Sequence, residues 1–144
     1  MNRENHTPPA RTAPPEPRRI FIPFYGPSTN DIYSGVHWSV RKRAKDGALK
    51  AVKAVVRQLD IDIPISTRVD LVFTPQLGKG VRKRDTSNNS MTAKLVEDAL
   101  VKSGVLHDDT DEYVRNVTNT PALIDRKGDT GVWVEIIPVI EVAA

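Results

Sequence analysis

The sequence predicts an α+β fold in which a small mixed sheet is combined with two main helices. Short segments in which apolar and polar residues alternate indicate half-buried strands, and two longer segments with apolar residues three and four positions apart indicate amphipathic helices. Strands and helices follow one another in mixed order, which is typical of the α+β class. The chain has 144 residues, of which 39% are hydrophobic, so one domain with a single moderate core is expected.

Residues 1–19 are predicted to form a disordered, proline-rich arm. They contain five prolines and almost no large apolar residue, so they bury too little surface to offset the entropy lost on ordering. The globular domain is therefore expected over 20–144. The arginines of the arm either contact nucleic acid or belong to a solvated leader.

The first strand is expected over 20–25, and the turn-forming residues after it predict a loop over 26–30. A helix is predicted over 38–59 because apolar residues recur there at three- and four-residue spacing. Arg43 and Lys50 belong to a different, basic face of this helix. That face is either a surface for a phosphate backbone or a solvated helix surface.

Alternating residues predict the second strand over 67–73, and Pro75 with the glycines after it is expected to end this strand. A second helix is predicted from a cap at Asn89 or Ser90 to a stop at Gly104. Its predicted apolar face consists of Met91, Leu95, Ala99 and Leu100.

Two more strands are predicted over 113–124 and 131–142, joined through the turn-forming residues 125–129. The last of these strands contains Pro138. Because proline cannot donate to a ladder of hydrogen bonds, this strand is expected at an edge of the sheet.

Composition restricts the classes of function. The chain has no cysteine, so a metal ion would have to be held by oxygen or imidazole ligands. No apolar run approaches the roughly 20 residues of a membrane span and no secretory signal is evident, so we expect a soluble, cytoplasmic protein without a membrane partner. The net charge of +3 is a weak argument for nucleic acid, but the basic residues are clustered.

The segment 82–109 has the residue types needed to handle phosphates. Three basic residues directly precede Asp85, Lys94 lies within the predicted helix, and the pair Asp108–Asp109 follows that helix. A fold that brings these parts together would collect three carboxylates beside a positive surface, which suits Mg²⁺ or, as a substitute, Mn²⁺. The alternatives are a solvated acidic loop and, for Lys94 with Asp98, a surface pair one helical turn apart.

The motifs of this segment stand in a particular order: a basic run, a D-x-D-N motif, a lysine in the helix, an Asp-Ala-Leu motif, a glycine turn and an Asp-Asp pair. This order resembles that of the RusA-type Holliday junction resolvases, which bacteriophages often carry. Together with the upstream Pro27-Ser28-Thr29-Asn30, the resemblance spans roughly 20–139. The matching residues are Arg82-Lys83-Arg84, Asp85-Thr86-Ser87-Asn88, Lys94, Asp98-Ala99-Leu100, Lys102-Ser103-Gly104 and Asp108-Asp109.

The resemblance implies a RusA-like domain and a homodimeric endonuclease that resolves four-way DNA junctions with Mg²⁺, in recombination, repair or phage DNA processing. Asp85 and Asp109 are the expected catalytic metal ligands, and Asp108 is a further ligand or a partner of one. Lys94 is expected to stabilise the phosphate or the leaving group. The expected DNA-binding residues are Arg82, Lys83, Arg84, Arg43 and Lys50, with Asn30 and Asn88 as secondary candidates.

One position departs from the family pattern, because Ser87 stands where the second carboxylate of D-x-D-N is expected. A hydroxyl is a weaker Mg²⁺ ligand than a carboxylate, so metal affinity and rate should fall unless Asn88, Asp111 or Glu112 compensates. This leaves two alternatives to a nuclease. The first is a catalytically degenerate protein that binds junctions, and the second is a phage scaffold or host-interaction protein whose charges only solvate its surface.

Overall fold

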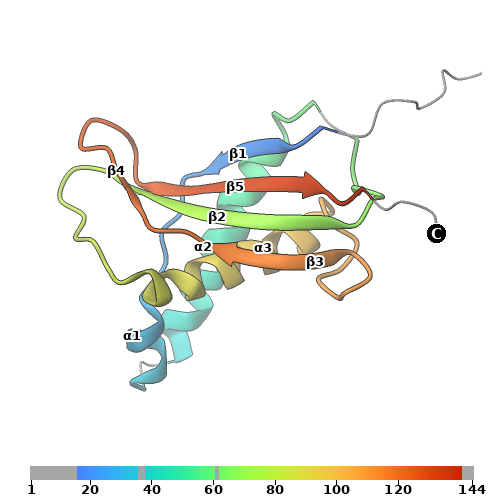
Figure 1. Ribbon diagram of the computed structural model, residues 1–144. Coiled ribbons are helices and arrows are strands. Elements are labelled where there is room, and N and C mark those ends of the chain that lie inside the picture. Colours follow the sequence, from blue (N-terminus) through green and yellow to red (C-terminus); the bar gives the residue numbers. More distant parts are fainter. Residues whose placement is uncertain (1–15, 36–37, 61, 141–144) are drawn as a thin grey trace, which may run out of the picture.

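The computed structural model describes residues 16–35, 38–60 and 62–140. It confirms the predicted α+β class: the strands form one mixed sheet, and the helices lie along one of its faces (Figure 1). The strand order is β1–β5–β2–β3, with β4 also beside β2. The strands are β1 (Arg18–Ile22), β2 (Val69–Leu77), β3 (Val114–Asn119), β4 (Leu123–Ile124) and β5 (Gly131–Pro138).

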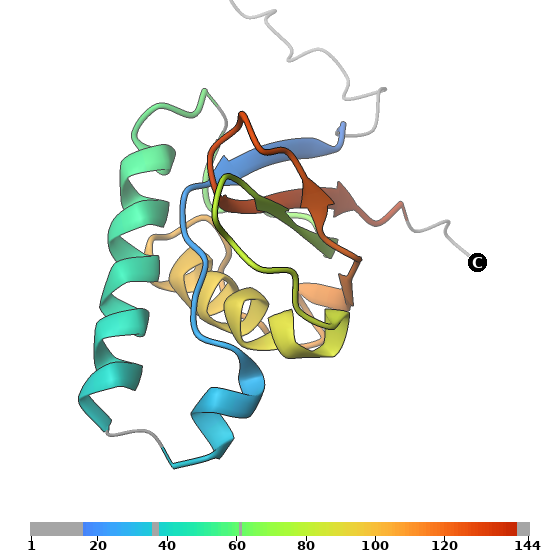
Figure 2. The ribbon, with the colours of Figure 1, turned by 90° about the vertical axis from the view of Figure 1, so that its left-hand side faces the viewer.

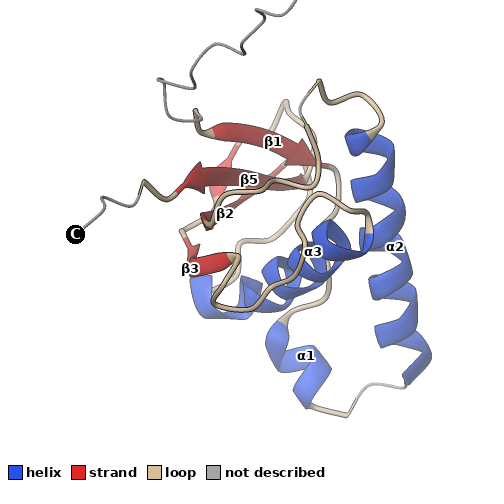
Figure 3. Cartoon of the chain, turned by 90° about the vertical axis from the view of Figure 1, so that its right-hand side faces the viewer, coloured by secondary structure: helices blue, strands red, loops and turns tan. Residues whose placement is uncertain are grey.

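The helices form the second layer of the molecule. In the side view of Figure 2, α2 runs alongside both α3 and the strands, and Figure 3 shows all three α-helices on the same side of the sheet. None of the helices in the described part of the chain is long and apolar enough to cross a lipid bilayer. The helices are α1 (Thr29–Tyr33), α2 (Trp38–Val56), the 3₁₀ helix η1 (Thr86–Asn89) and α3 (Ser90–Lys102).

The core lies between the sheet and the helices. Alternate residues of β2 are buried along its whole length, as the period of two in a strand requires. Val69, Leu71 and Phe73 of β2 pack with Val52 of α2 and Val96 of α3. Because these side chains are almost completely removed from water, each contributes roughly 1.5–3 kcal/mol of hydrophobic stabilisation.

The expectation that Pro75 ends the second strand is wrong, since β2 continues to Leu77. Phe73 and Leu77, on either side of Pro75, accept backbone hydrogen bonds from the residues that follow β3 and β4. Residues two apart in a strand direct their backbone groups to the same side. Pro75 therefore faces the gap between β3 and β4, where no N–H is required.

The last two predicted strands do not lie side by side. The segment predicted over 113–124 is divided into β3 and β4, and β2 lies between these strands and β5. The prediction of an edge position for the strand of Pro138 is wrong, because β5 lies between β1 and β2. Pro138 is nevertheless tolerated, since it is the final residue of β5 and the ladder ends there.

The other boundaries differ in smaller ways. Strand β1 begins at Arg18, so the last residues of the predicted disordered arm are ordered by pairing with β5, while 1–15 lie outside the described residues. The loop predicted over 26–30 contains the start of α1, which Ser28 caps by accepting a hydrogen bond from Asp31 N at 3.0 Å. Helix α2 ends at Val56, slightly before its predicted end.

Helix α3 has the predicted extent, and its predicted apolar face is confirmed in part. Ala99 and Leu100 are buried, whereas Met91 and Leu95 are only partly buried, and Ala93 and Val96 face the core in addition. The predicted stop at Gly104 is confirmed, and its φ of 86° is one that glycine adopts readily.

Candidate active site

Lys94 and Asp109 are brought together by the fold, although they are far apart in the sequence. Lys94 Nζ lies 3.4 Å from Asp109 Oδ2 and 3.2 Å from Asp98 Oδ1. Asp98 lies one turn after Lys94 on α3, whereas Asp109 comes from the loop after the helix. Two of the three residues predicted to be catalytic therefore share one ion-pair cluster, which we call the acidic site: Lys94, Asp98 and Asp109.

The end of α3 explains why the loop returns toward the helix. Gly104 N donates to Val101 O at 3.1 Å and Val105 N donates to Leu100 O at 2.9 Å, the hydrogen bonds of a Schellman motif. Val105 and Leu106, which are almost completely buried, then anchor the chain in the core. Beyond this anchor, the loop runs past the exposed side of α3 and places Asp109 beside Lys94.

Asp108 has a different position from Asp109. Its side chain is exposed, and its Oδ1 accepts a hydrogen bond from the backbone N–H of Asp109 at 2.8 Å. This bond helps to fix the turn in which Asp109 lies. One carboxylate of the predicted pair thus orients the other.

Glu97 lies beside the acidic site on α3, and the sequence reading did not single it out. Only 8% of the residue is exposed and it makes no hydrogen bond within the described ranges, but neither of its carboxyl oxygens is a fully enclosed atom without a partner. Burial raises the pKa of the Glu97 carboxyl, the nearby Lys94 ammonium lowers it, and the carboxylates of Asp109 and Asp98 raise it further. The helical spacing could have revealed this position, since Glu97 follows Ala93 by four residues and precedes Leu100 by three.

The charge of Lys94 is stabilised in this site. The hydrogen bond to Asp98 raises the pKa of Lys94, burial opposes the increase, and Asp109 adds to it. Lys94 is therefore a fixed cation beside several carboxylates at neutral pH. Such a group can neutralise charge that develops on a phosphate.

A shallow pocket joins the acidic site to basic residues of two helices. Its volume is about 150 Å³, and Lys45 of α2 and Lys102 of α3 line it together with Asp98 and Asp109. Carboxylates that can hold a metal ion and ammonium groups that can hold phosphate thus border one depression.

Asp85 occupies the position before η1 and is exposed. Its backbone carbonyl accepts a hydrogen bond from Asn88 N at 2.9 Å, but no hydrogen bond or ion pair within the described ranges joins its side chain to Lys94 or Asp109. The described residues contain no ready-made group of three or more His, Asp or Glu side chains around a metal position. Mg²⁺ in proteins is commonly held by only one or two carboxylates together with water and substrate phosphates. The carboxylate oxygens of this site meet that requirement.

The secondary candidates lie around the N-terminal end of α3. Ser87 is exposed, and its backbone carbonyl accepts a hydrogen bond from Ser90 Oγ at 2.9 Å. Asn30 is exposed in α1, whereas Asn88 is half-buried in η1. Thr29 connects α1 with α3, because its Oγ1 accepts a hydrogen bond from Met91 N at 3.2 Å.

The three residues of the basic run have different surroundings. Arg82 and Lys83 are exposed, whereas Arg84 is half-buried, with its guanidinium carbon 4.2 Å from the centre of the Tyr25 ring. Arg84 Nη1 also donates to Gly26 O at 2.9 Å, and the Tyr25 hydroxyl donates to Asn89 Oδ1 at 2.6 Å. We call this group the arginine clamp: Tyr25, Gly26, Arg84 and Asn89.

The basic face of α2 is exposed, as predicted. Arg43, Lys50, Lys53 and Arg57 all have exposed side chains. Lys42, in contrast, pairs with Asp46 at 2.8 Å, and its hydrogen bond is the main reason that the pKa of Asp46 is lowered. Part of the positive charge of α2 is thus neutralised within the helix, and the rest faces solvent.

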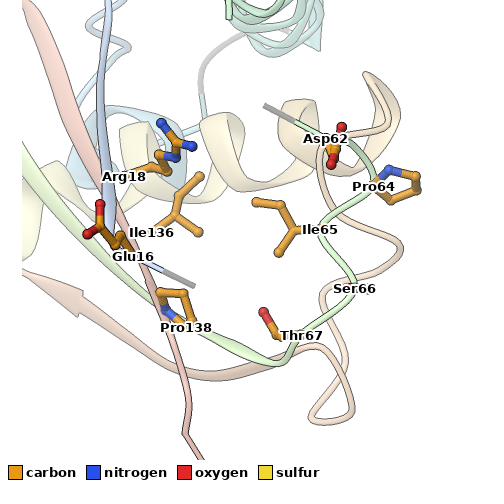
Figure 4. A pocket seen from close by; sticks show the side chains of 9 residues that line it. All are labelled: Glu16, Arg18, Asp62, Pro64, Ile65, Ser66, Thr67, Ile136 and Pro138. Carbon is orange, nitrogen blue, oxygen red and sulfur yellow. The ribbon is translucent and has the colours of Figure 1, made fainter. Parts of the chain in front are cut away.

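A separate pocket lies where β1 begins and β5 ends (Figure 4). It has a volume of about 230 Å³, and its charged lining residues are Glu16, Arg18 and Asp62. None of the residues that line it belongs to the acidic site.

No protein-family model matches this chain, and a search of curated proteins finds no match either.

Proposed function

We propose that this protein is a Mg²⁺-dependent endonuclease that resolves four-way DNA junctions, as its resemblance to the RusA-type resolvases implies. The observation that supports this most directly is the contact between Lys94 and Asp109, the helix lysine and a carboxylate of the Asp-Asp pair. The two residues lie 15 positions apart, so helical spacing alone does not bring them together. Lys45 and Lys102 beside them add the positive charge that a DNA strand requires.

The chemistry assigns a role to each of these side chains. Asp109 and Asp85 would hold the Mg²⁺ ion, which would supply positive charge to activate water and polarise the phosphate. Asp108 orients Asp109 through the hydrogen bond that it accepts from the Asp109 backbone N–H. Lys94 stabilises negative charge on the phosphate or on the leaving oxygen.

The DNA is bound mainly through its phosphates. Arg82 and Lys83 are exposed on the segment that leads to Asp85, and Arg43 and Lys50 are exposed on α2. Contacts to phosphates position a strand without reading its bases, which suits a protein that recognises the shape of a junction. We further propose that two copies of the chain act together on paired strands, and that the protein functions in the cytoplasm.

The test is a cleavage assay with a synthetic four-way junction and a linear duplex of the same sequence, each with Mg²⁺, Mn²⁺ or EDTA. We expect metal-dependent, symmetric cutting of the junction. The variants Asp85→Asn and Asp109→Asn should still bind the junction but lose cleavage, and Glu135→Gln on the far face of the sheet should cut normally. Metal-independent cutting, or equal cutting by the Asp109→Asn variant, contradicts the proposal.

Ser87 supports a second candidate, a junction-binding protein without nuclease activity. The position lacks the carboxylate that the resemblance leads one to expect, and a hydroxyl is a poorer Mg²⁺ ligand. Selective junction binding without cleavage at every Mg²⁺ or Mn²⁺ concentration would favour this candidate. The variant Ser87→Asp should then gain cleavage, because it restores the carboxylate.

A further inference from the structure

We propose that an apolar pocket between the three α-helices binds an unpaired DNA base next to the phosphate that is cut, and that the indole ring of Trp38 stacks on this base. The proposal rests on the nuclease function, since it names the part of the substrate that lies beside the acidic site. Aromatic side chains commonly bind unpaired bases in this way, because every base has a flat face on which a ring can stack.

The size and the lining of the pocket suit a planar, uncharged group. Its volume is about 470 Å³, within the range of about 300–1,000 Å³ typical of sites for small molecules. Trp38 is 66% exposed, whereas Ile32 is buried and Leu95 is partly buried. A ligand can therefore reach the indole ring and also contact an apolar wall. The apolar lining residues come from α1, α2 and α3: Ile32, Trp38, Ala44, Met91 and Leu95.

The charged residues of the pocket favour a nucleotide over an apolar protein segment. Arg41, Lys42 and Lys45 of α2 complete the lining, which contains no carboxylate among the described residues. Arg41 Nη2 donates to Ile32 O at 3.0 Å and Lys42 pairs with Asp46 at 2.8 Å, whereas Lys45 is exposed. An apolar segment would gain nothing from these cations. A nucleotide has both a flat base for the pocket and a phosphate for the cations.

Lys45 connects the apolar pocket with the acidic site. It lines this pocket and also the shallow pocket that contains Asp98 and Asp109. Trp38 precedes Lys45 by seven residues on α2, so the two lie on the same face of the helix, about 10 Å apart along its axis. The lysine side chain and one nucleotide together span this distance. A phosphate bound at Lys45 would thus have its neighbouring base at Trp38.

The test compares two probes in EDTA, so that cleavage does not intervene. One probe is oligothymidylate, and the other is an abasic oligomer of the same length, which has the same phosphates but no bases. The chain has two tryptophans, so in a Trp133→Phe variant the intrinsic fluorescence reports on Trp38 alone. We expect oligothymidylate to quench this fluorescence and the abasic oligomer to leave it unchanged. Fluorescence anisotropy of end-labelled probes then gives the affinities.

Variants of Trp38 test the role of its ring. Trp38→Ala should weaken the binding of oligothymidylate about 5- to 150-fold, the loss typical when a stacked base loses its aromatic partner. Trp38→Phe should keep most of the affinity, because it keeps an aromatic ring. Both variants should bind the abasic oligomer as the original protein does. Leu123→Ala is the control: it shortens an exposed apolar side chain of β4 outside the pocket and should bind both probes normally.

The outcomes separate the base site from the nuclease. Equal affinity for the two probes, or unchanged binding of oligothymidylate by Trp38→Ala, overturns the base site even if the protein cuts junctions. Loss of self-association in Trp38→Ala with unchanged DNA binding overturns it too, and would assign the pocket to a second copy of the chain. Binding of oligothymidylate that depends on Trp38, by a protein that cuts no junction, supports the base site but contradicts the proposed nuclease.

Discussion

The arginine clamp and the acidic site both contain residues of segment 82–109, but their polar groups have different surroundings. In the arginine clamp, Arg84, Tyr25 and Asn89 are at least half-buried. Arg84 donates a hydrogen bond to Gly26 O at 2.9 Å, and the Tyr25 hydroxyl donates one to Asn89 Oδ1 at 2.6 Å. In the acidic site, Lys94 and Asp109 meet only as an ion pair at 3.4 Å, and the Lys94 side chain is 55% exposed.

This difference separates residues that maintain the fold from residues that are available for chemistry. Buried hydrogen bonds to a charged group contribute about 1.5–3 kcal/mol, whereas exposed ion pairs contribute about 0–1 kcal/mol. Changes in the arginine clamp should therefore lower stability, and changes in the acidic site should lower activity while leaving the fold intact. The basic run of the motif contains both kinds of residue, since Arg82 is exposed whereas Arg84 is fixed by its hydrogen bond to Gly26 O.

The largest expected effect is that of Lys94→Ala on cleavage. Removal of a group that stabilises charge in the transition state typically slows a reaction about 100-fold or more. We expect a loss of this size in the single-turnover rate of junction cutting, with a change below about 1 kcal/mol in the free energy of unfolding. Lys50→Ala is the control: it should weaken junction binding and reduce its salt dependence without slowing the cutting of bound DNA.

The next largest effect is expected for Arg84→Ala. This change removes the hydrogen bond to Gly26 O and the contact with the Tyr25 ring, so we expect a loss of about 1.5–3 kcal/mol in the free energy of unfolding by urea. The matched variant Arg82→Ala should change stability by less than about 0.5 kcal/mol while it weakens binding of DNA. Equal stabilities of the two variants would remove the distinction between the regions.

Tyr25→Phe tests the buried part of the arginine clamp alone. It removes the hydroxyl that donates to Asn89 Oδ1 at 2.6 Å but keeps the ring beneath Arg84. Asn89 is almost completely buried and its Nδ2 already lacks a partner among the described residues, so we expect a loss of about 1–2 kcal/mol. Thermal unfolding followed by circular dichroism measures this loss, and junction cleavage at 25 °C should be unchanged.

The smallest effect is expected at Asp70, a carboxylate that pairs with Arg115 and lies outside the acidic site. Arg115 Nη2 lies 2.6 Å from Asp70 Oδ2, and the hydrogen bond from Arg115 is the main reason that the pKa of Asp70 is lowered. A lowered pKa stabilises the folded state above the ordinary value of 3.8, and this contribution is lost as the pH falls through the lowered value. Because the Asp70–Arg115 pair is partly exposed, we expect it to contribute up to about 1 kcal/mol to the free energy of unfolding.

The variant Asp70→Asn isolates that contribution. It should lower the free energy of unfolding at pH 6 and converge with the original protein in strong acid, where Asp70 is protonated in both the folded and the unfolded state. Urea titrations across this pH range provide the measurement. A constant difference at every pH would show that the substitution acts by packing rather than by charge.

Sequence patterns predicted the local elements better than their pairing. The apolar spacing predicted the helix beginning at Trp38, and the glycine at 104 predicted the end of α3, because both features depend on neighbouring residues. The prediction that Pro75 ends the second strand was wrong because the nitrogen of Pro75 faces the gap between β3 and β4, where no N–H is needed. That gap arises only from the pairing of β2 with β3 and β4. The position of β5 between β1 and β2 likewise depends on contacts between distant segments.

The same distinction applies to the site. The motif order suggested that Lys94 and Asp109 belong together, and the fold places them in contact. Glu97 was missed because a glutamate in a helix usually faces solvent, and only the packing of α3 against the sheet buries it. In the sequence, Arg84 was not distinguished from Arg82. The contact that distinguishes it, with the Tyr25 ring, joins residues that are remote in the sequence and so leaves no local pattern.

The central place of β5 has a consequence for the order in which the molecule can assemble. This strand follows the other described strands in the sequence, yet it separates the first strand from the second and pairs with both. Before β5 has been synthesised, β1 and β2 have no common neighbour, so the sheet that supports α3 cannot close. We therefore expect the sheet to form only once β5 is available, at the slow rate typical of long-range strand pairing. Any activity that depends on the position of α3 would be absent until then.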